Sequence, residues 1–404
     1  MTATSLPSDQ QIIPATADAN GCWPTREQEL LLSAALVEGE SAVGAWETWR
    51  RVADLSLVDI ESRRLFPLLY KNLKRHRVED PLVERFRETF SRTYFDNHML
   101  FERATVVLRS LEEARISTMV LKGAALAVAY YGDLGLRGML DFDILVPDNR
   151  ALDAMRVLKT LGWHGTYHRE PEKRIDVTHS VPFRDPTSRQ IDLHWHVLTE
   201  CWHADDDRGF WQHSVPMEVN GVETRRLDPT DQLAHICVHG RKWDDPPPIR
   251  WIADAVTILR LHGPSIDWDR FIRNLEYRHL VLPGLEALEY VRGHFDSPVP
   301  DAVIHRLRET RTSRVDRFIY RMETAPYRRL STAEVLGVLY ADLMRIGTSR
   351  RGVRRFTAFA RRTRALWRHY PAWQLPFRLP FRLARRVVHR LGGRRTAKTP
   401  PPSS

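Results

Sequence analysis

The chain has 404 residues, of which 43% are hydrophobic and 28% are charged, the balance expected of a soluble globular protein. No apolar run approaches the roughly 18 to 20 residues that a membrane-spanning helix requires, and the first 25 residues lack the basic and apolar segments of a secretory signal. Three scattered cysteines are too few for a disulfide framework or a cysteine-based metal site. We therefore expect a cytoplasmic protein of two or three domains.

The net charge of +10 is concentrated at one end of the chain. Residues 350–404 contain 15 Arg and one Lys without any Asp or Glu, so the preceding residues carry 45 basic against 51 acidic side chains. The overall charge therefore does not predict that the folded body binds nucleic acid. In this basic tail, arginines are interleaved with Phe, Trp and Leu. Such a segment suits a peripheral position at an anionic membrane surface, a nucleic acid, an acidic partner, or docking on the acidic body of the same chain.

The first part of the chain is expected to be a disordered segment followed by helices. Residues 1–24 are rich in Ser, Thr, Ala, Asp and Pro and are expected to be disordered. Residues 25–115 are expected to be all-helical, because apolar residues recur at helical spacing and Thr25 is a suitable N-cap. After the first helix, further helices are predicted over residues 41–53, 61–76, 80–98 and 99–115.

The sequence pattern of residues 116–227 differs from that of the preceding helices and predicts a compact mixed α/β core. The first strand is β-branched and apolar and ends at Gly123, and the helix after it is stopped by Gly132. Polar residues 163–190 are expected to form hairpins, and a further alternating strand follows. Strand, helix, strand, helix and further strands are predicted in this order at residues 116–123, 124–132, 139–146, 149–163 and 163–198.

Residues 228–347 are again predicted to be helical. Asp228 is a suitable N-cap, and Pro229 suits the first helical position because its missing N–H has no partner there in any case. The basic tail, residues 348–404, is expected to be helical in places, broken at its prolines and disordered at its end. Further helices are predicted over residues 250–261, 267–277, 281–294, 301–323 and 331–346.

The most informative motif is an aspartate pair on one predicted strand. Alternate side chains of a strand share a face, so Asp141 and Asp143 point the same way while Phe142 and Ile144 point into the core. Two carboxylates held so close together repel each other, and burying them is costly unless a cation lies between them. Mg²⁺ prefers oxygen ligands and usually binds carboxylates together with phosphates and water. A pair of solvent-exposed acids at a strand edge is the alternative interpretation.

Two further features favour the metal site. Lys122 and Gly123 lie at a strand-to-helix turn, where a glycine allows close approach of a phosphate and the helix presents free N–H groups to an anion. Asp192 lies between apolar neighbours on another predicted strand. A third carboxylate facing Asp141 and Asp143 would complete a two-metal site, and it could also help to deprotonate an attacking hydroxyl.

Residues 121–163 resemble a family of uncharacterised bacterial nucleotidyltransferases within the DNA polymerase β-like superfamily. The likeness is carried by the Leu-Lys-Gly turn at 121–123, the strand Leu-Asp-Phe-Asp at 140–143, and the later Asp-Leu-His-Trp strand at 192–195. It extends outward to the Tyr-Phe-Asp-Asn stretch at 94–97 and to the Arg-Trp-Ile-Ala-Asp stretch at 250–254. In all, it covers roughly residues 28–262.

The resemblance implies an α+β fold, a small mixed β-sheet nucleotidyltransferase core flanked by N-terminal and C-terminal helical regions. It implies that Asp141, Asp143 and Asp192 are the catalytic residues and bind Mg²⁺ (or Mn²⁺), and that a phosphate approaches Gly123. Lys122 and Ala124 then belong to the nucleotide-binding turn. At the position of Ala124 the wider superfamily has Ser or Gly, so this chain offers no hydroxyl there, and the interval between Gly123 and Asp141 is longer than in well-known members.

Two residues near this motif each have two open interpretations. Arg137 matches the family's arginine before the aspartate pair, and it either neutralises a phosphate or pairs with an acid. Asp254 is interpreted as a helix acid that pairs with a neighbouring arginine, with a catalytic role as the alternative.

Histidines form a second possible constellation. His235 and His239 lie four residues apart on a predicted helix, and Asp231 lies one turn before them, so all three share a face. A zinc site, a packed or hydrogen-bonded role, and a substrate pocket that includes His194 are the three interpretations.

The function implied is transfer of a nucleoside monophosphate from a nucleoside triphosphate to an unknown acceptor, with release of pyrophosphate. Positioning and metal electrostatics would supply the catalysis without a covalent enzyme intermediate. Two alternatives are a catalytically inactive scaffold or binding protein that keeps the fold, and a membrane-peripheral accessory protein.

Overall fold

The computed structural model describes residues 22–166, 170–175, 178–200, 204–241 and 246–324. The predicted helix at 331–346 and the basic tail at 348–404 lie outside the described residues, as does nearly all of the N-terminal segment that was predicted to be disordered. Within the described residues, no helix is both long and apolar enough to cross a membrane.

Four helices precede the sheet region: α1 (Arg26–Leu36), α2 (Glu40–Val52), α3 (Ile60–Arg63) and α4 (Phe66–Arg75). Thr25 caps α1 as predicted, with its side chain accepting from the backbone N–H of Gln28. The single helix predicted over 61–76 is wrong, because α3 ends and α4 begins within it. Pro67 explains the break, since it has no N–H for the carbonyl of Arg63 and its ring would clash there.

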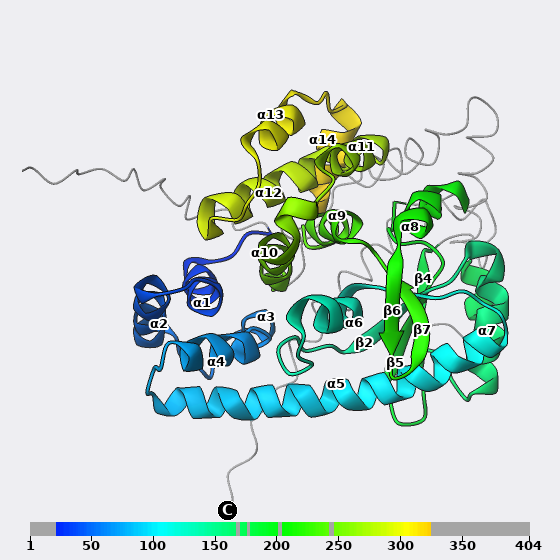
Figure 1. Ribbon diagram of the computed structural model, residues 1–404, viewed down its shortest axis with the longest axis horizontal. Coiled ribbons are helices and arrows are strands. Elements are labelled where there is room, and N and C mark those ends of the chain that lie inside the picture. The colour runs from blue at the N-terminus through cyan, green and yellow to red at the C-terminus, as the bar shows by residue number, and fades with distance from the viewer. Residues whose placement is uncertain (1–21, 167–169, 176–177, 201–203, 242–245, 325–404) are drawn as a thin grey trace, which may run out of the picture.

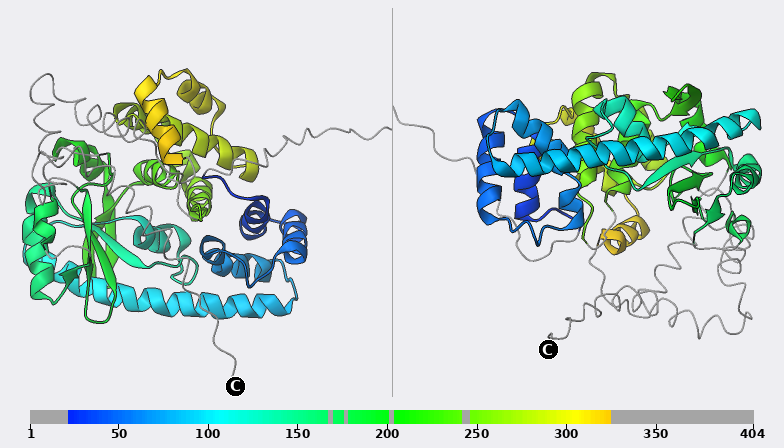
Figure 2. Two further views of the ribbon diagram at one scale, coloured as in Figure 1. Left: turned by 180° about the vertical axis from the view of Figure 1, so that it is seen from behind. Right: turned by 90° about the horizontal axis from the view of Figure 1, so that it is seen from below.

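The long helix α5 (Pro81–Glu113) joins the N-terminal helices to the sheet. It runs beneath both in Figure 1, and the view from below in Figure 2 shows it crossing most of the molecule. We predicted two helices here, and the structure has one. No glycine or proline interrupts the sequence between Leu82 and Glu113, and the buried apolar positions Leu100, Ala104 and Leu111 continue the helical period to its end.

The described residues contain one seven-stranded mixed sheet with the order β3-β4-β5-β2-β1-β7-β6. The pairs β2–β5 and β1–β7 are parallel, and the other neighbours are antiparallel. The predicted α+β fold class is therefore confirmed. The strands are β1 (Met119–Val120), β2 (Asp141–Leu145), β3 (His164–Gly165), β4 (Ser180–Arg184), β5 (Gln190–His194), β6 (Val215–Val219) and β7 (Val222–Arg226).

Short helical segments connect the strands. The predicted helix after the first strand begins as α6 and continues as a π-helical turn, and Gly132 ends it with a φ of 64°. The predicted helix at 149–163 is shorter than expected and ends before Gly162. The connecting segments are α6 (Lys122–Leu126), the π-helical turn (Ala127–Tyr131), α7 (Ala151–Thr160), α8 (Arg208–His213), and 3₁₀ turns at Asp148–Arg150, Pro171–Arg174 and Ala204–Asp207.

The two faces of the sheet belong to different hydrophobic clusters. Phe142, Ile144 and Leu193 pack into a cluster that also contains buried residues of α5 and α7. Leu145, on the opposite face, belongs to a second cluster with the C-terminal helices. Because residues alternate along a strand, the acidic residues of β2 face the side of the C-terminal helices.

The C-terminal helices are α9 (Pro229–His239), α10 (Arg250–His262), α11 (Trp268–Tyr277), α12 (Val281–Phe295), α13 (Asp301–Glu309) and α14 (Arg314–Thr324), with a 3₁₀ turn at Gly263–Ser265. Asp228 caps α9 and Pro229 begins it, as predicted. The single helix predicted over 301–323 is wrong. The hydroxyl of Ser313 accepts from the backbone N–H of Asp316, and this N-cap starts a separate helix.

Candidate functional site

The acidic residues singled out in the sequence lie on β2 and β5, which are neighbours in the sheet. The two strands are parallel, and their register pairs Asp143 with Asp192 and Leu145 with His194. Paired residues of adjacent strands point to the same face, as do residues two apart on one strand. Asp141 and Asp143 therefore share one face with Asp192. His194 follows on that face at the end of β5.

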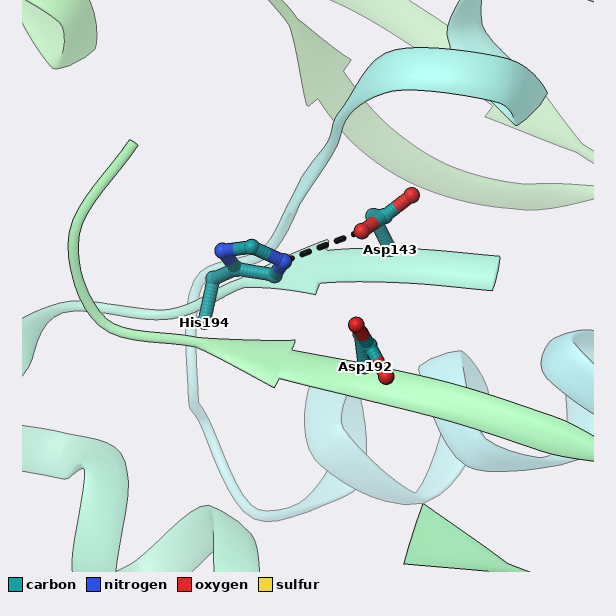
Figure 3. A group of neighbouring side chains, drawn as sticks. All are labelled: Asp143, Asp192 and His194. Carbon is teal, nitrogen blue, oxygen red and sulfur yellow. Dashed lines mark hydrogen bonds and ion pairs between the residues drawn. The ribbon is translucent and has the colours of Figure 1, made fainter. Parts of the chain in front are cut away.

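Asp143, Asp192 and His194 form a compact group (Figure 3). One possible ligand atom from each of these side chains lies within 4.8 Å of the other two. Asp143 Oδ1 accepts a hydrogen bond from Lys122 Nζ at 2.7 Å and one from His194 Nε2 at 2.9 Å. Asp141 shares the face but is not one of the three, so within the described residues the closest group contains a histidine in place of the third expected aspartate.

Burial and mutual repulsion separate the acidities of the three carboxyl groups. Burial alone would raise the pKa of Asp143, but the charge of Lys122 and the hydrogen bond from His194 hold it well below its usual range. Burial, together with the charge of Asp143, raises the pKa of Asp141 to about 6. Burial and the charges of Asp143 and Asp141 raise that of Asp192 to about 7. The positive charge of Lys122 and the hydrogen bond from His194 together therefore outweigh the effect of burial on Asp143, but Lys122 offsets burial and repulsion only in part for Asp141 and Asp192.

The turn between β1 and α6 brings the Lys122 ammonium to the carboxylates. Lys122 itself has a left-handed backbone conformation, with a φ of 46°, which costs about 1 kcal/mol for a residue with a Cβ. Burial opposes the charge of Lys122, but Asp143, Asp192 and Asp141 outweigh it and raise the pKa of the ammonium. The strained residue of this turn is thus the lysine, whereas the sequence had drawn attention to the glycine.

Gly123 leaves the backbone accessible to a phosphate, and the packing around it also requires a residue without a Cβ. A Cβ at Gly123 would lie 2.7 Å from Arg137 Nη1 and 2.9 Å from the Met139 side chain, distances at which atoms must shift. Ala124, the next residue of α6, is fully buried. One nitrogen of the Arg137 guanidinium therefore faces the glycine of the turn.

Arg137 pairs with Asp254, 117 residues further along the chain. Its Nε and Nη2 donate to the two carboxylate oxygens at 2.8 Å each, and both residues are buried. Tyr131, at the end of the π-helical turn, donates from its hydroxyl to the same carboxylate at 2.9 Å. Asp254 does pair with an arginine, but the prediction of a neighbouring arginine is wrong, because the partner is Arg137 in the loop before β2. For Arg137, pairing with an acid is observed, and Nη1 is the nitrogen that faces Gly123.

Asn97 of α5 holds the loop that carries Arg137. Its side-chain nitrogen donates to the carbonyls of Leu134 and Arg137, and its oxygen accepts from the N–H of Met139. These three bonds fix the loop just before β2. The sequence marked Asn97 only as part of a family-like stretch, because a loop-holding role requires knowing that α5 passes under residues 134–139.

Arg250, the first residue of α10, was also missed as a site residue. Its side chain donates to the carbonyl of Gly138, and its charge acts on Asp141. Burial, together with the neighbouring charge of Arg137, lowers the pKa of Arg250 to about 10. It therefore stays cationic at neutral pH close to the carboxylates. The signal in the sequence was the basic residue that opens the Arg-Trp-Ile-Ala-Asp stretch.

The helix α9 brings His235 toward the same centre. Burial and the charge of Lys122 lower the pKa of His235 to about 3, with smaller effects from Asp143 and His194. Its ring lies 5.6 Å from that of His239, centroid to centroid. Asp231, which the sequence offered as a third zinc ligand, instead binds Arg270 and Asn274. Among the described residues, Asp231, His235 and His239 do not form a possible metal group.

Comparison with known proteins gives one family match. The sequence profile of a family described as "Uncharacterised nucleotidyltransferase" matches residues 49–296. No curated protein matches the chain. Among solved structures, the antibiotic-resistance factor ANT(2'')-Ia is 15% identical over 49% of this chain and 99% of its own, with a TM-score of 0.33. An antigenic nucleotidyltransferase-like protein from Paracoccidioides brasiliensis is 15% identical over 51% and 96%, with a TM-score of 0.32.

Proposed function

The chain belongs to the family of uncharacterised nucleotidyltransferases, a class of transferases, and on this premise we propose that it transfers a nucleoside monophosphate from a nucleoside triphosphate to an acceptor. The observation that carries the proposal is the face shared by Asp141, Asp143 and Asp192 on two parallel strands. Acids so arranged are suited to phosphoryl chemistry, in which positioning and electrostatics supply most of the catalysis.

The donor set of this face fits a divalent cation. Three carboxylates share it, and the raised pKa values of Asp141 and Asp192 reflect desolvation and repulsion that Lys122 does not fully offset. Carboxylate oxygens are the ligands that Mg²⁺ and Mn²⁺ prefer. We assign Asp141, Asp143 and Asp192 as the residues that would hold such an ion. When bound, it would neutralise the charge that develops on the phosphates.

The remaining residues are assigned by their contacts with this centre. Lys122 and Arg250 are cations beside the carboxylates, and we assign them to the phosphate groups of the triphosphate, together with Gly123, Ala124 and the Nη1 side of Arg137. His194 keeps Asp143 oriented through its hydrogen bond. His235 and His239 are assigned to the acceptor side, because the charges of Lys122 and Asp143 act on His235 and the His239 ring lies beside it.

In the proposed reaction, an acceptor oxygen or nitrogen forms a bond to the α-phosphorus. The bond from that phosphorus to the bridging oxygen breaks, and pyrophosphate leaves with the electron pair. The proton of the acceptor passes to a carboxylate, for which we assign Asp192, the acid of this face that lies on the second strand.

Incubation of the full chain with α-labelled ATP, GTP, CTP or UTP and Mg²⁺ or Mn²⁺ tests this function. We expect release of pyrophosphate together with a labelled acceptor, and binding of a nonhydrolysable triphosphate in calorimetry. Glu84→Gln, an exposed change on the outer side of α5, is the matched control that should behave like the wild type. Absence of nucleotide binding with all four bases would contradict the proposal and would favour a scaffold.

Cation binding is expected to depend on pH. The ion requires ionised ligands, and Asp141 and Asp192 have pKa values raised to about 6 and about 7 in the free protein. Mn²⁺ affinity should therefore fall about 10-fold from pH 7 to pH 6, and about 50-fold more from pH 6 to pH 5, as one and then two protons must be displaced. Above about pH 7.5 it should be constant.

Calorimetry in buffers with different ionisation enthalpies measures both the affinity and the number of protons released. Asp192→Asn should release one proton fewer at pH 6.5 than the wild type. An affinity that does not change between pH 5.5 and pH 8 would show that these carboxylates do not bind the ion.

A further inference from the structure

Two buried polar side chains of α9 have hydrogen-bonding atoms that find no partner among the described residues. Neither ring nitrogen of His235, and neither the oxygen nor the nitrogen of the Gln232 amide, makes a hydrogen bond to any described residue. Gln232 is 0% exposed and His235 is 2% exposed. Buried polar groups are almost always paired, because leaving them unpaired costs stability. Four such atoms on one helix therefore call for a role other than folding.

The unpaired groups lie on one face of α9. Gln232 and His235 are three residues apart and so are neighbours on the helix surface. Two other polar residues of the same helix are paired with residues at the start of α11. The Thr230 hydroxyl accepts from the N–H of Asp267, and the Asp231 carboxylate binds Arg270. The contacts with the start of α11 thus pair Thr230 and Asp231, whereas Gln232 and His235 stay unpaired among the described residues.

His235 lies beside the acidic centre of the sheet. The charges of Lys122, Asp143 and His194 all act on its ring, as does that of Glu200. With a pKa of about 3, caused first by burial and next by Lys122, the ring is uncharged at neutral pH. Gln232 carries no charge at any pH. A ligand that enters between α9 and the carboxylates therefore meets two neutral side chains, each of which can donate and accept.

We propose that Gln232 and His235 bind the attacking hydroxyl group of the acceptor and a neighbouring hydroxyl, so that the acceptor is an uncharged polyhydroxylated compound. The proposal rests on the nucleotidyltransferase function proposed above. A hydroxyl group both donates and accepts, which matches the neutral imidazole and the carboxamide. An ammonium group has no lone pair and would leave the donors of both side chains unpaired. A carboxylate would likewise leave their acceptors unpaired and would be repelled by the three aspartates.

These contacts would position the hydroxyl oxygen for attack on the α-phosphorus. That oxygen forms the new P–O bond, the bond to pyrophosphate breaks, and the hydroxyl proton passes to a carboxylate of the site. His235 and Gln232 act as positioning residues, since they orient the hydroxyl without exchanging its proton. A site built to pair a hydroxyl discriminates strongly against analogues that lack one, because its own buried groups are then left unpaired.

The first measurement is thermal stability of the full chain. If Gln232 and His235 are kept for a ligand, apolar replacements of similar shape should stabilise the protein. We expect Gln232→Leu and His235→Phe each to raise Tm by about 2–4 °C. Ser297→Ala is the matched control, because the Ser297 hydroxyl is buried between α12 and α13 and also has no hydrogen-bond partner among the described residues. It should raise Tm without changing transfer.

The second measurement is acceptor choice. The wild type is given α-labelled triphosphate with glycerol, monosaccharides and inositol, and in parallel with ethylamine and acetate. Label should enter the polyols and sugars and neither of the other two. Gln232→Leu and His235→Phe should raise the KM for the acceptor or abolish its labelling, and kcat/KM for the acceptor should fall at least 100-fold. The Kd for a nonhydrolysable triphosphate should stay within twofold of the wild-type value. His235→Gln, which can still donate and accept, should recover part of the transfer.

The outcomes separate this inference from the function on which it rests. A wild type that binds no triphosphate contradicts the proposed function itself. A wild type that binds triphosphate but labels ethylamine or acetate as readily as the polyols, or labels no hydroxyl compound, overturns the hydroxyl subsite alone. Variants that keep the wild-type KM for the acceptor, or that lower Tm by the amount expected for a lost core hydrogen bond, also overturn it.

Discussion

Asp143→Asn and Asp192→Asn are each expected to lower kcat roughly 1,000-fold, because a lost carboxylate ligand removes several kcal/mol of electrostatic stabilisation from the transition state. Asp143 and Asp192 lie opposite each other in the register of β2 and β5, so neither can take the place of the other. Steady-state release of pyrophosphate from the triphosphate measures the effect. Activity within tenfold of the wild type in either variant would contradict the assignment.

The two variants should differ in stability, which controls for unfolding as the cause. The pKa of Asp192 is raised to about 7, above the unfolded value of about 3.9. Its ionisation therefore weakens the fold progressively as the pH rises from about 4 to about 7. Asp192→Asn should raise the free energy of unfolding at pH 8.

For Asp143, the change of stability with pH has the opposite sign. Its pKa is held below the unfolded value, so its stabilising contribution is present above about pH 4 and is lost below that range. Asp143→Asn removes the negative partner of Lys122 and should lower the free energy of unfolding by about 1–3 kcal/mol. Urea denaturation at pH 8, followed by circular dichroism, distinguishes the two. Changes of the same sign in both variants would contradict the charge distribution described for this face.

The largest effect on stability is expected from Arg137→Met. This change leaves the Asp254 carboxylate buried without its bidentate partner, and breaking a buried ion pair on one side costs about 3–5 kcal/mol. The double variant Arg137→Met, Asp254→Asn removes both charges and keeps an acceptor for the Tyr131 hydroxyl. It should recover most of the lost free energy of unfolding, as measured by urea denaturation.

The double variant also tests the second interpretation of Arg137. If Nη1 of Arg137, which faces Gly123, contacts a phosphate, the folded double variant should bind a nonhydrolysable triphosphate about 10-fold more weakly than the wild type. Unchanged affinity would leave Arg137 as a structural partner of Asp254 alone. A double variant as unstable as Arg137→Met would contradict the ion pair as the source of the cost.

Several residues of the site have features that lower the stability of the fold. Lys122 has a left-handed backbone, and burial and the charges of Asp143 and Asp141 raise the pKa of Asp192. Gln232 and His235 are buried without hydrogen-bond partners among the described residues. Strain and unpaired polar groups of this kind tend to gather where a protein binds or reacts. Here they lie on one face of β2 and β5, in the turn that begins α6, and on α9.

The sequence by itself determined the local features of this protein. The alternation in Leu-Asp-Phe-Asp-Ile fixes that Asp141 and Asp143 share a face, because side-chain direction along a strand depends only on its period of two. The caps at Thr25 and Asp228 were equally readable, since a cap involves residues three apart. The motifs also led to the nucleotidyltransferases, in agreement with the family profile that matches residues 49–296. Helix boundaries were missed where α3, α5 and α13 begin or end, because apolar periodicity marks the buried face more clearly than it marks a break.

Only the tertiary structure decided which distant residues meet. The pairing of β2 with β5, which lie 49 residues apart in the chain, sets Asp143 beside Asp192. It also brings His194, and not Asp141, into the compact group with these two acids. The partner of Arg137 lies on α10, and His235 of α9 comes under the influence of Lys122 and Asp143 although more than 90 residues separate them in the chain. Such contacts are selected by the packing of the whole core, and no local period records them.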